Sequence, residues 1–141
     1  MGSPDPVIII HSLTQAIGAV RAAASAKRAI VLASASDAGG YVGPGWFGAL
    51  VTAARQAVPE ARFCAFLDCG DSVGAALAAI RAEVEGVIFT GRADVARRLS
   101  EIARQHRVRF ETKRPAATLD LAEDFFASQE YIERRCGEFL G

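Results

Sequence analysis

Short apolar segments alternate with longer stretches of helical periodicity, and this alternation is the feature that most constrains the fold. Continuous apolar runs occupy residues 7–10, 29–33, 63–67 and 87–89, and a weaker run of alternating polarity covers 108–112. Between them, apolar residues recur every three or four positions, as on one face of a helix. The exception is the glycine-rich stretch of residues 34–45, which we expect to form a long ordered loop. Strict strand–helix alternation favours a parallel sheet with right-handed crossovers. We therefore predict an α/β fold with four to five parallel strands, resembling part of a TIM barrel or forming an open doubly wound sheet.

The length of 141 residues suits one domain. We assign residues 1–114 to the α/β domain and residues 115–141 to a C-terminal linker and helix. Apolar residues mark one face of this expected helix: Leu121, Phe125, Ile132, Cys136 and Phe139. Because a partial barrel has open sheet edges and an uncovered apolar face, we expect this helix to pack on the same domain or on a partner subunit. We also expect a homo-oligomer.

The charge balance excludes some classes of partner. Lys+Arg and Asp+Glu both number 16, whereas nucleic-acid-binding domains usually carry a basic excess, so we expect no nucleic-acid partner. No apolar run approaches the roughly 20 residues of a membrane helix, and the N-terminus lacks the basic start of a signal peptide. The three cysteines do not form the spacing pattern of a disulfide framework. We expect a cytoplasmic protein with no membrane partner.

Polar residues follow the expected strands, at the end where parallel α/β sheets carry their sites. Asp68 directly follows five apolar residues, so burial there would suit a general acid, although the carboxylate would equally bind loop amides or cap the next helix. Cys69 is a candidate nucleophile or metal ligand, or else a small buried thiol. The other candidates at the strand ends are His11, Ser12, Ser34, Ser36, Asp37, Asp71, Thr90, Arg92, Glu111 and Lys113. We predict that a ligand would contact His11, Ser34, Ser36, Thr90, Gly91 and Arg92.

Two groups of these candidates suggest specific chemistry, an anion site and a metal site. Gly91 and Arg92 open a helix, where free amides and a guanidinium suit an anion, although an ordinary turn with a solvated arginine has the same sequence. His11 could join Asp68 and Cys69 in a metal site, but zinc sites need three or four ligands and no CxxC, HxxH or HExxH motif is present. We predict no metal site and no cofactor, with a divalent metal as the alternative.

The ordered set of these segments resembles the N-terminal part of the zinc-dependent class II aldolases, which act on fructose and tagatose bisphosphates. Residues 30–36 followed by Tyr41-Val42-Gly43 resemble the family's second strand and its Tyr-x-Gly loop. Leu67-Asp68-Cys69-Gly70 is similar to its Leu-Asp-His-Gly signature, and residues 87–92 resemble the stretch that ends in Asp-Gly-Ser. The resemblance covers about residues 7–112. It implies a barrel-like fold and maps the family's catalytic acid/base onto Asp68.

The departures from the family pattern bear on activity. A zinc-ligating His is replaced by Cys69, the Asp of Asp-Gly-Ser is replaced by Thr90, and the later half of the barrel lies outside the resemblance. Class II chemistry needs a metal ion to polarise the ketose carbonyl. We therefore expect no class II aldolase activity, but a non-catalytic protein that binds a small anionic metabolite, such as a sugar phosphate. The alternatives are a lyase that uses Asp68 and Cys69, and a protein–protein interaction module.

Overall fold

The computed structural model describes residues 5–115 and 118–141, in which six parallel strands are ordered β5-β4-β3-β2-β1-β6. The strands are β1 Val7–Ile9, β2 Ile30–Ala33, β3 Phe63–Asp68, β4 Gly86–Ile88, β5 Arg109–Glu111 and β6 Thr118–Asp120. The helices are α1 Leu13–Ala26, α2 Ala38–Tyr41, α3 Gly43–Ala57, α4 Val73–Arg81, α5 Ala93–Gln105, the 3-10 turn η1 Ala122–Asp124 and α6 Gln129–Leu140. None of these helices is both long and apolar enough to cross a membrane.

The chain divides into two compact units. The first unit contains Met1–Ala33, Leu50–Cys64 and Ala116–Gly141, and the second contains Ser34–Ala49 and Ala65–Pro115. Within the expected domain of residues 1–114, Ser34–Ala49 and Ala65–Pro115 group separately from the remainder, and the C-terminal segment belongs to the unit that holds β1 and α1. The two units are described separately below.

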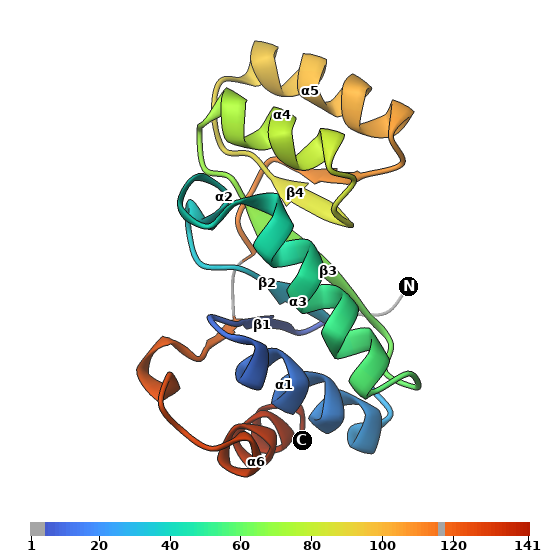
Figure 1. The fold of residues 1–141 in the computed structure, drawn as a ribbon, viewed down its shortest axis with the longest axis vertical. Helices are drawn as coiled ribbons and strands as arrows, with labels where there is room; N and C mark the ends of the chain where they lie inside the picture. Colours follow the sequence, from blue (N-terminus) through green and yellow to red (C-terminus); the bar gives the residue numbers. More distant parts are fainter. Residues whose placement is uncertain (1–4, 116–117) are drawn as a thin grey trace. The chain divides into compact units, whose positions relative to one another are not determined.

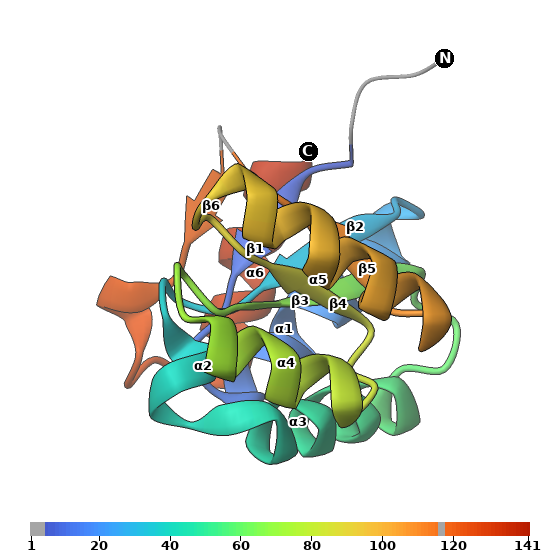
Figure 2. The same ribbon diagram turned by 90° about the horizontal axis from the view of Figure 1, so that it is seen from above.

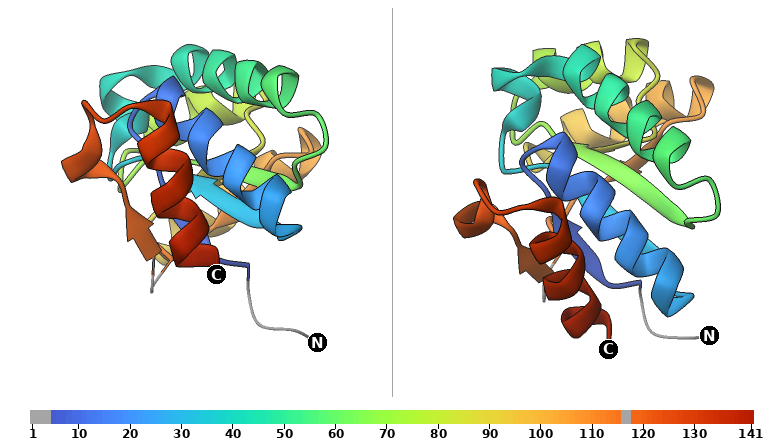
Figure 3. Two further views of the ribbon diagram at one scale, coloured as in Figure 1. Left: turned by 90° about the horizontal axis from the view of Figure 1, so that it is seen from below. Right: turned by 60° about the horizontal axis from the view of Figure 1, so that its bottom comes forward.

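In the first unit, β1 is the central strand and pairs with β2 on one side and β6 on the other, with Val7 opposite Val31 and Thr118. Its residues are fully apolar and buried, as strands covered on both faces should be. Ser12 caps α1, and its hydroxyl oxygen accepts from the N–H of Gln15 at 3.2 Å. The α6 helix lies alongside α1 (Figure 3), and Ile132 from α6 is fully buried against Gly18 of α1.

In the second unit, β4 pairs with β3 and β5, with Val87 opposite Leu67 and Phe110. The helices α4 and α5 pack side by side (Figures 1 and 2). Ser72 caps α4 by accepting from the N–H of Ala75 at 3.1 Å. Apolar residues at three-to-four spacing, such as Ala76, Ala79 and Ile80, form the buried face of this helix.

The α/β class, the parallel sheet and the strand–helix alternation are confirmed. The strand number of four to five is wrong, because Thr118–Asp120 forms a sixth strand. Three residues are too few to show strand periodicity, and pairing with β1 supplies the stabilisation that the local sequence lacks. Strands β1 to β5 lie in chain order, as in a barrel, with β6 on the other side of β1.

Two other expectations need correction. Residues 34–45 were expected to form a long loop, but α2 lies within them and α3 begins at Gly43, because Pro44 is compatible with the first turn of a helix. The single final helix expected from Leu121 is instead the 3-10 turn η1 followed by α6, which Ser128 caps. The expected linker at 115–118 includes residues 116–117, which lie outside the described residues.

The contact between α1 and α6 predicts a position-dependent effect of adding one methyl group. A Cβ at Gly18 would lie 2.7 Å from Ile132 Cγ2, so Gly18→Ala forces two packed helices apart. We expect the variant to lose about 1–3 kcal/mol of unfolding free energy in urea titrations. Gly137→Ala in α6 is the matched control, because no atom of the described residues outside the adjacent helix backbone lies within 4 Å of its Cβ position, and it should gain about 0.5–1 kcal/mol. Equal effects at both positions would contradict the packing.

Candidate functional site

Asp68, the last residue of β3, is a buried carboxylate, with 1% of its surface exposed. Its Oδ1 accepts hydrogen bonds from the backbone N–H of Asp37 at 3.0 Å and of Gly70 at 2.9 Å. A buried carboxylate is tolerated only when donors replace its lost water. Asp68 therefore ties the loop after β2 to the loop after β3, both within the second unit.

The second oxygen of Asp68 bonds Arg114. The guanidinium Nη1 donates to Asp68 Oδ2 in a close ion pair. About one third of the Arg114 side chain is exposed, whereas the Asp68 side chain is almost fully buried. The pair is therefore asymmetric, with a buried anion that fixes a cation at the surface of the unit.

Ser34 supports the same carboxylate through the backbone. It is fully buried, and its Oγ accepts from the N–H of Asp68 at 2.8 Å. The Ser34 hydroxyl donates to the carbonyl of Ala35 at 3.1 Å, and its N–H donates to the carbonyl of Phe66 at 3.0 Å. Because its two donors and its hydroxyl oxygen are used in these contacts, Ser34 holds the start of the loop after β2 against the end of β3 within the second unit.

The two loops approach so closely that a glycine is required. Gly70 has a positive φ of 58°, and a Cβ built there would lie 1.7 Å from Asp37 Oδ1. Asp37 itself adopts the left-handed region, at a φ of 62°, which aspartate tolerates better than most residues. Across the same approach, a Cβ at Gly39 would lie 2.7 Å from Cys69 Sγ. The site is thus a closely fitted pair of loops around one carboxylate.

Cys69 is a buried thiol, with 1% of its surface exposed. Burial, and to a lesser extent the charge of Asp68, raises the pKa of this thiol from 9.0 to about 12. The Sγ atom lies 3.8 Å from the carbonyl oxygen of Leu67, to which it donates. A thiol that stays protonated at neutral pH is a poor nucleophile.

The predicted anion site at Gly91 and Arg92 has its own local pairing. Arg92 donates through Nε and Nη2 to both carboxylate oxygens of Asp94, at 3.1 Å and 2.9 Å, and its side chain is 79% exposed. Gly91 lies against the ring of Phe89. Thr90 is exposed, and its N–H donates to the carbonyl of Gly70 at 2.8 Å, which joins it to the Asp68 loop. Ser36 is exposed between Ser34 and Asp37.

His11 belongs to the first unit, where its Nε2 lies 2.7 Å from Asp120 Oδ1. The N–H of His11 donates to the side chain of Gln15, and Gln15 in turn donates to the carbonyl of Leu121. These bonds hold the segment after β6 against the start of α1. Within residues 5–115 and 118–141, no three His, Cys, Asp or Glu side chains could hold a metal ion, so the trio His11–Asp68–Cys69 does not form one.

Arg114 is the residue around Asp68 that sequence reasoning missed. It lies three residues beyond β5, next to the candidate Lys113, in a stretch without apolar periodicity. The available signal was a buried carboxylate expected at Asp68, which requires a cation somewhere in the chain. Which of the 16 Lys and Arg residues supplies it depends on the fold.

The ion pair predicts a difference between two arginines. Arg114→Gln leaves the buried Asp68 carboxylate without its cation, so we expect a loss of about 1–3 kcal/mol of unfolding free energy in urea titrations. Arg92→Gln removes an exposed pair with Asp94 and should change stability by less than about 0.5 kcal/mol. Similar losses in both variants would contradict the structural weight given to Asp68 and Arg114.

The burial of the thiols predicts their reactivity. Cys64 is partly exposed, whereas Cys69 and Cys136 are buried with pKa values raised to about 12, chiefly by burial. We expect Ellman's reagent at pH 8 to modify Cys64 alone in the native protein and all three thiols in guanidinium. Native modification of Cys69 at pH 8 would contradict this assignment.

The same burial predicts how stability depends on pH. Thiols in the unfolded chain ionise near pH 9, whereas Cys69 and Cys136 stay protonated in the folded protein, so the unfolding free energy should fall as pH rises from 9 to 12.

Comparison with known proteins supports the fold alone. No protein-family model matches the sequence, and no curated protein is significantly similar to it. Among solved structures, a similar fold is that of a protein from Coccidioides immitis, provisionally described as a fructose-1,6-bisphosphate aldolase. The match has a TM-score of 0.60 and 15% sequence identity, and it covers 75% of this chain and 39% of that one. The chain therefore has an aldolase-like α/β fold and spans well under half the length of this structural neighbour.

Proposed function

We propose that the second unit binds a small hydroxylated metabolite with an anionic group, such as a sugar phosphate, and that Arg114 is its anchoring cation. The observation that carries the proposal is the ion pair between buried Asp68 and partly exposed Arg114. A fixed guanidinium at the surface loses less side-chain entropy on binding than a free one.

Arg114 keeps donors for a ligand. A guanidinium has five N–H groups, and the bond to Asp68 Oδ2 uses one Nη1 hydrogen. Asp68 cannot accept more from Arg114 through Oδ1, because that oxygen already accepts from Asp37 and Gly70. The remaining planar edge of the guanidinium has the fork geometry that suits phosphate and carboxylate oxygens.

The neighbouring groups favour a ligand with hydroxyls. Ser36 and Asp37 are exposed beside the loop that Asp68 organises, and a carboxylate and a hydroxyl both accept from a sugar hydroxyl. Since these groups carry no positive charge, the anionic part of the ligand belongs at Arg114. The sequence-based choice of Arg92 is less suitable, because Asp94 already binds its fork edge.

The role proposed is binding without turnover. Asp68 is engaged by two amides and a guanidinium, so a proton transfer at either oxygen would break one of those bonds. Cys69 remains protonated at neutral pH. The fold neighbour named for fructose 1,6-bisphosphate suggests the first probe, and no reaction is transferred from it.

The test is isothermal titration of the protein with fructose 1,6-bisphosphate, with unphosphorylated fructose as the control ligand. We expect saturable binding of the bisphosphate alone. Arg114→Lys keeps the charge opposite Asp68 but loses the planar fork, so it should weaken binding at least about tenfold with little change in unfolding midpoint. Arg92→Lys is the matched control and should bind as the unaltered protein does.

Two results would overturn the proposal. One is the absence of saturable binding for fructose 1,6-bisphosphate and for a panel of other sugar phosphates. The other is binding that is weakened by Arg92→Lys and unchanged by Arg114→Lys. That result would show that the anion binds Arg92, at the start of α5.

A further inference from the structure

Two adjacent phenylalanines stand out on the surface of the first unit. Phe126 is 98% exposed and Phe125 is 47% exposed, directly after η1, and their rings meet edge-to-face with centroids 5.2 Å apart. We call Phe125 and Phe126 the Phe pair. An exposed aromatic pair with a fixed mutual geometry is typical of an interface anchor rather than of a solvated turn.

The surroundings of the Phe pair are acidic. Carboxylates precede and follow it at Asp120, Glu123, Asp124 and Glu130. Two of them are paired within the unit, Asp120 with His11 and Asp124 with Arg135. Glu123 and Glu130 are exposed and give the apolar tip an acidic border. A partner should therefore offer an apolar recess with a basic border.

The first unit itself contains such a recess. A pocket of about 410 Å³ has an apolar floor that includes Ile30, Ala61 and Phe63, and its border carries Arg55 and Arg62 together with one acid, Asp5. Arg55 is fixed there, with its guanidinium 4.0 Å from the centre of the Phe63 ring and a hydrogen bond to the Phe63 carbonyl. We call this cavity the Arg62 pocket.

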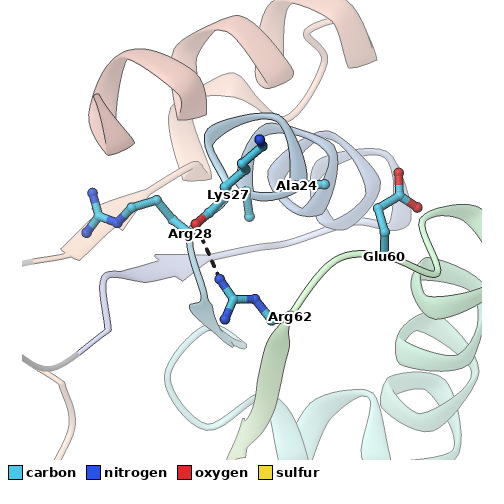
Figure 4. A pocket seen from close by; sticks show the side chains of 6 residues that line it. Ala24, Lys27, Arg28, Glu60 and Arg62 are labelled. Carbon is cyan, nitrogen blue, oxygen red and sulfur yellow. Dashed lines mark hydrogen bonds between the residues drawn. The ribbon is translucent and has the colours of Figure 1, made fainter.

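A neighbouring cavity makes the border more basic. Arg62 also lines a second pocket of about 340 Å³ with Lys27, Arg28 and Glu60 (Figure 4). In it, Arg62 donates to the carbonyl of Lys27 at 3.3 Å, and the side chains of Lys27 and Arg28 point away from each other. Because these cations diverge, the second pocket is not built for one small anion. Its contribution is positive charge beside the Arg62 pocket.

We propose that the Phe pair of one copy of this chain inserts into the Arg62 pocket of a second copy. The aromatic rings fill the apolar recess, and Glu123 meets Arg62 at its border. Both surfaces are apolar at the centre and their borders carry opposite charge, which decides for a second copy over an unrelated partner. The proposal is independent of ligand binding at Asp68, because both surfaces belong to the first unit.

The positions of the two surfaces define the kind of assembly. The segment that carries the Phe pair is bonded to the start of α1 through His11 and Gln15, whereas the Arg62 pocket lies beyond the end of α1, beside Ala29 and Ile30. The 14 residues of α1 separate them by about 21 Å at 1.5 Å per residue. We expect a head-to-tail contact, in which each copy donates its Phe pair to the next copy and receives one from the copy before, and such contacts give rings or open chains.

The test is sedimentation velocity over a range of protein concentrations. We expect the unaltered chain to form species beyond a dimer as concentration rises. Phe125→Ser/Phe126→Ser should raise the dissociation constant at least about tenfold. Tyr41→Ser, which removes an aromatic ring that is 80% exposed in the second unit, is the control and should associate normally.

A mixing experiment tests the head-to-tail geometry directly. The Phe125→Ser/Phe126→Ser variant lacks the Phe pair, and Arg62→Glu repels Glu123 at the pocket, so each variant should be monomeric alone. Mixed together, they retain one intact pocket and one intact Phe pair, and should form a one-to-one dimer that does not grow. Arg62→Glu combined with Glu123→Arg should restore self-association, which a misfolded Arg62→Glu chain would not do.

The proposal is overturned if the unaltered chain stays monomeric at every concentration. It is also overturned if the variant without the Phe pair associates as the unaltered chain does, or if the two monomeric variants fail to combine on mixing. Association that stops at a dimer in the unaltered chain would replace the head-to-tail contact with a two-fold one.

Discussion

The second unit is organised around the cost of burying one carboxylate. Asp68 ends a strand whose other residues are apolar, so its charge is removed from water where the polar loops begin. The amides of Asp37 and Gly70 and the guanidinium of Arg114 replace that water. Each donor comes from a different segment, and each segment is positioned by the bond it makes. Loss of any donor would leave part of a buried charge unsatisfied, which is among the more costly defects in a protein interior.

This arrangement is the basis of the proposed binding role. Acid/base chemistry needs a carboxyl group that exchanges protons with a substrate, but Asp68 is already committed to donors on both oxygens. Its charge instead holds Arg114 in place, and a fixed arginine is a good receptor for an anion. Cys69 also has a packing role, because its buried, protonated thiol fills the space beside Gly39. The proposed function and the structural role of Asp68 are therefore two consequences of one ion pair.

Features encoded by local periodicity were predictable from the sequence. The apolar runs identified the first five strands. Both readings of Asp68 were foreseen, and the structure favours the one in which the carboxylate binds loop amides. Features that depend on distant partners were not predictable: β6 exists through pairing with β1, and Arg114 is selected by a residue 46 positions away. Arg92 was chosen because it opens a helix, but Asp94, two positions on, already binds it.

A double-mutant cycle is the most direct test that Asp68 and Arg114 are coupled in their contributions to unfolding free energy. Unfolding free energies would be measured for the unaltered chain, Asp68→Asn, Arg114→Gln and the combined variant. We predict a favourable coupling energy of about 1–3 kcal/mol, so that the second substitution costs much less once the first is present. A coupling energy near zero would contradict the account, because the two side chains would then contribute to stability independently.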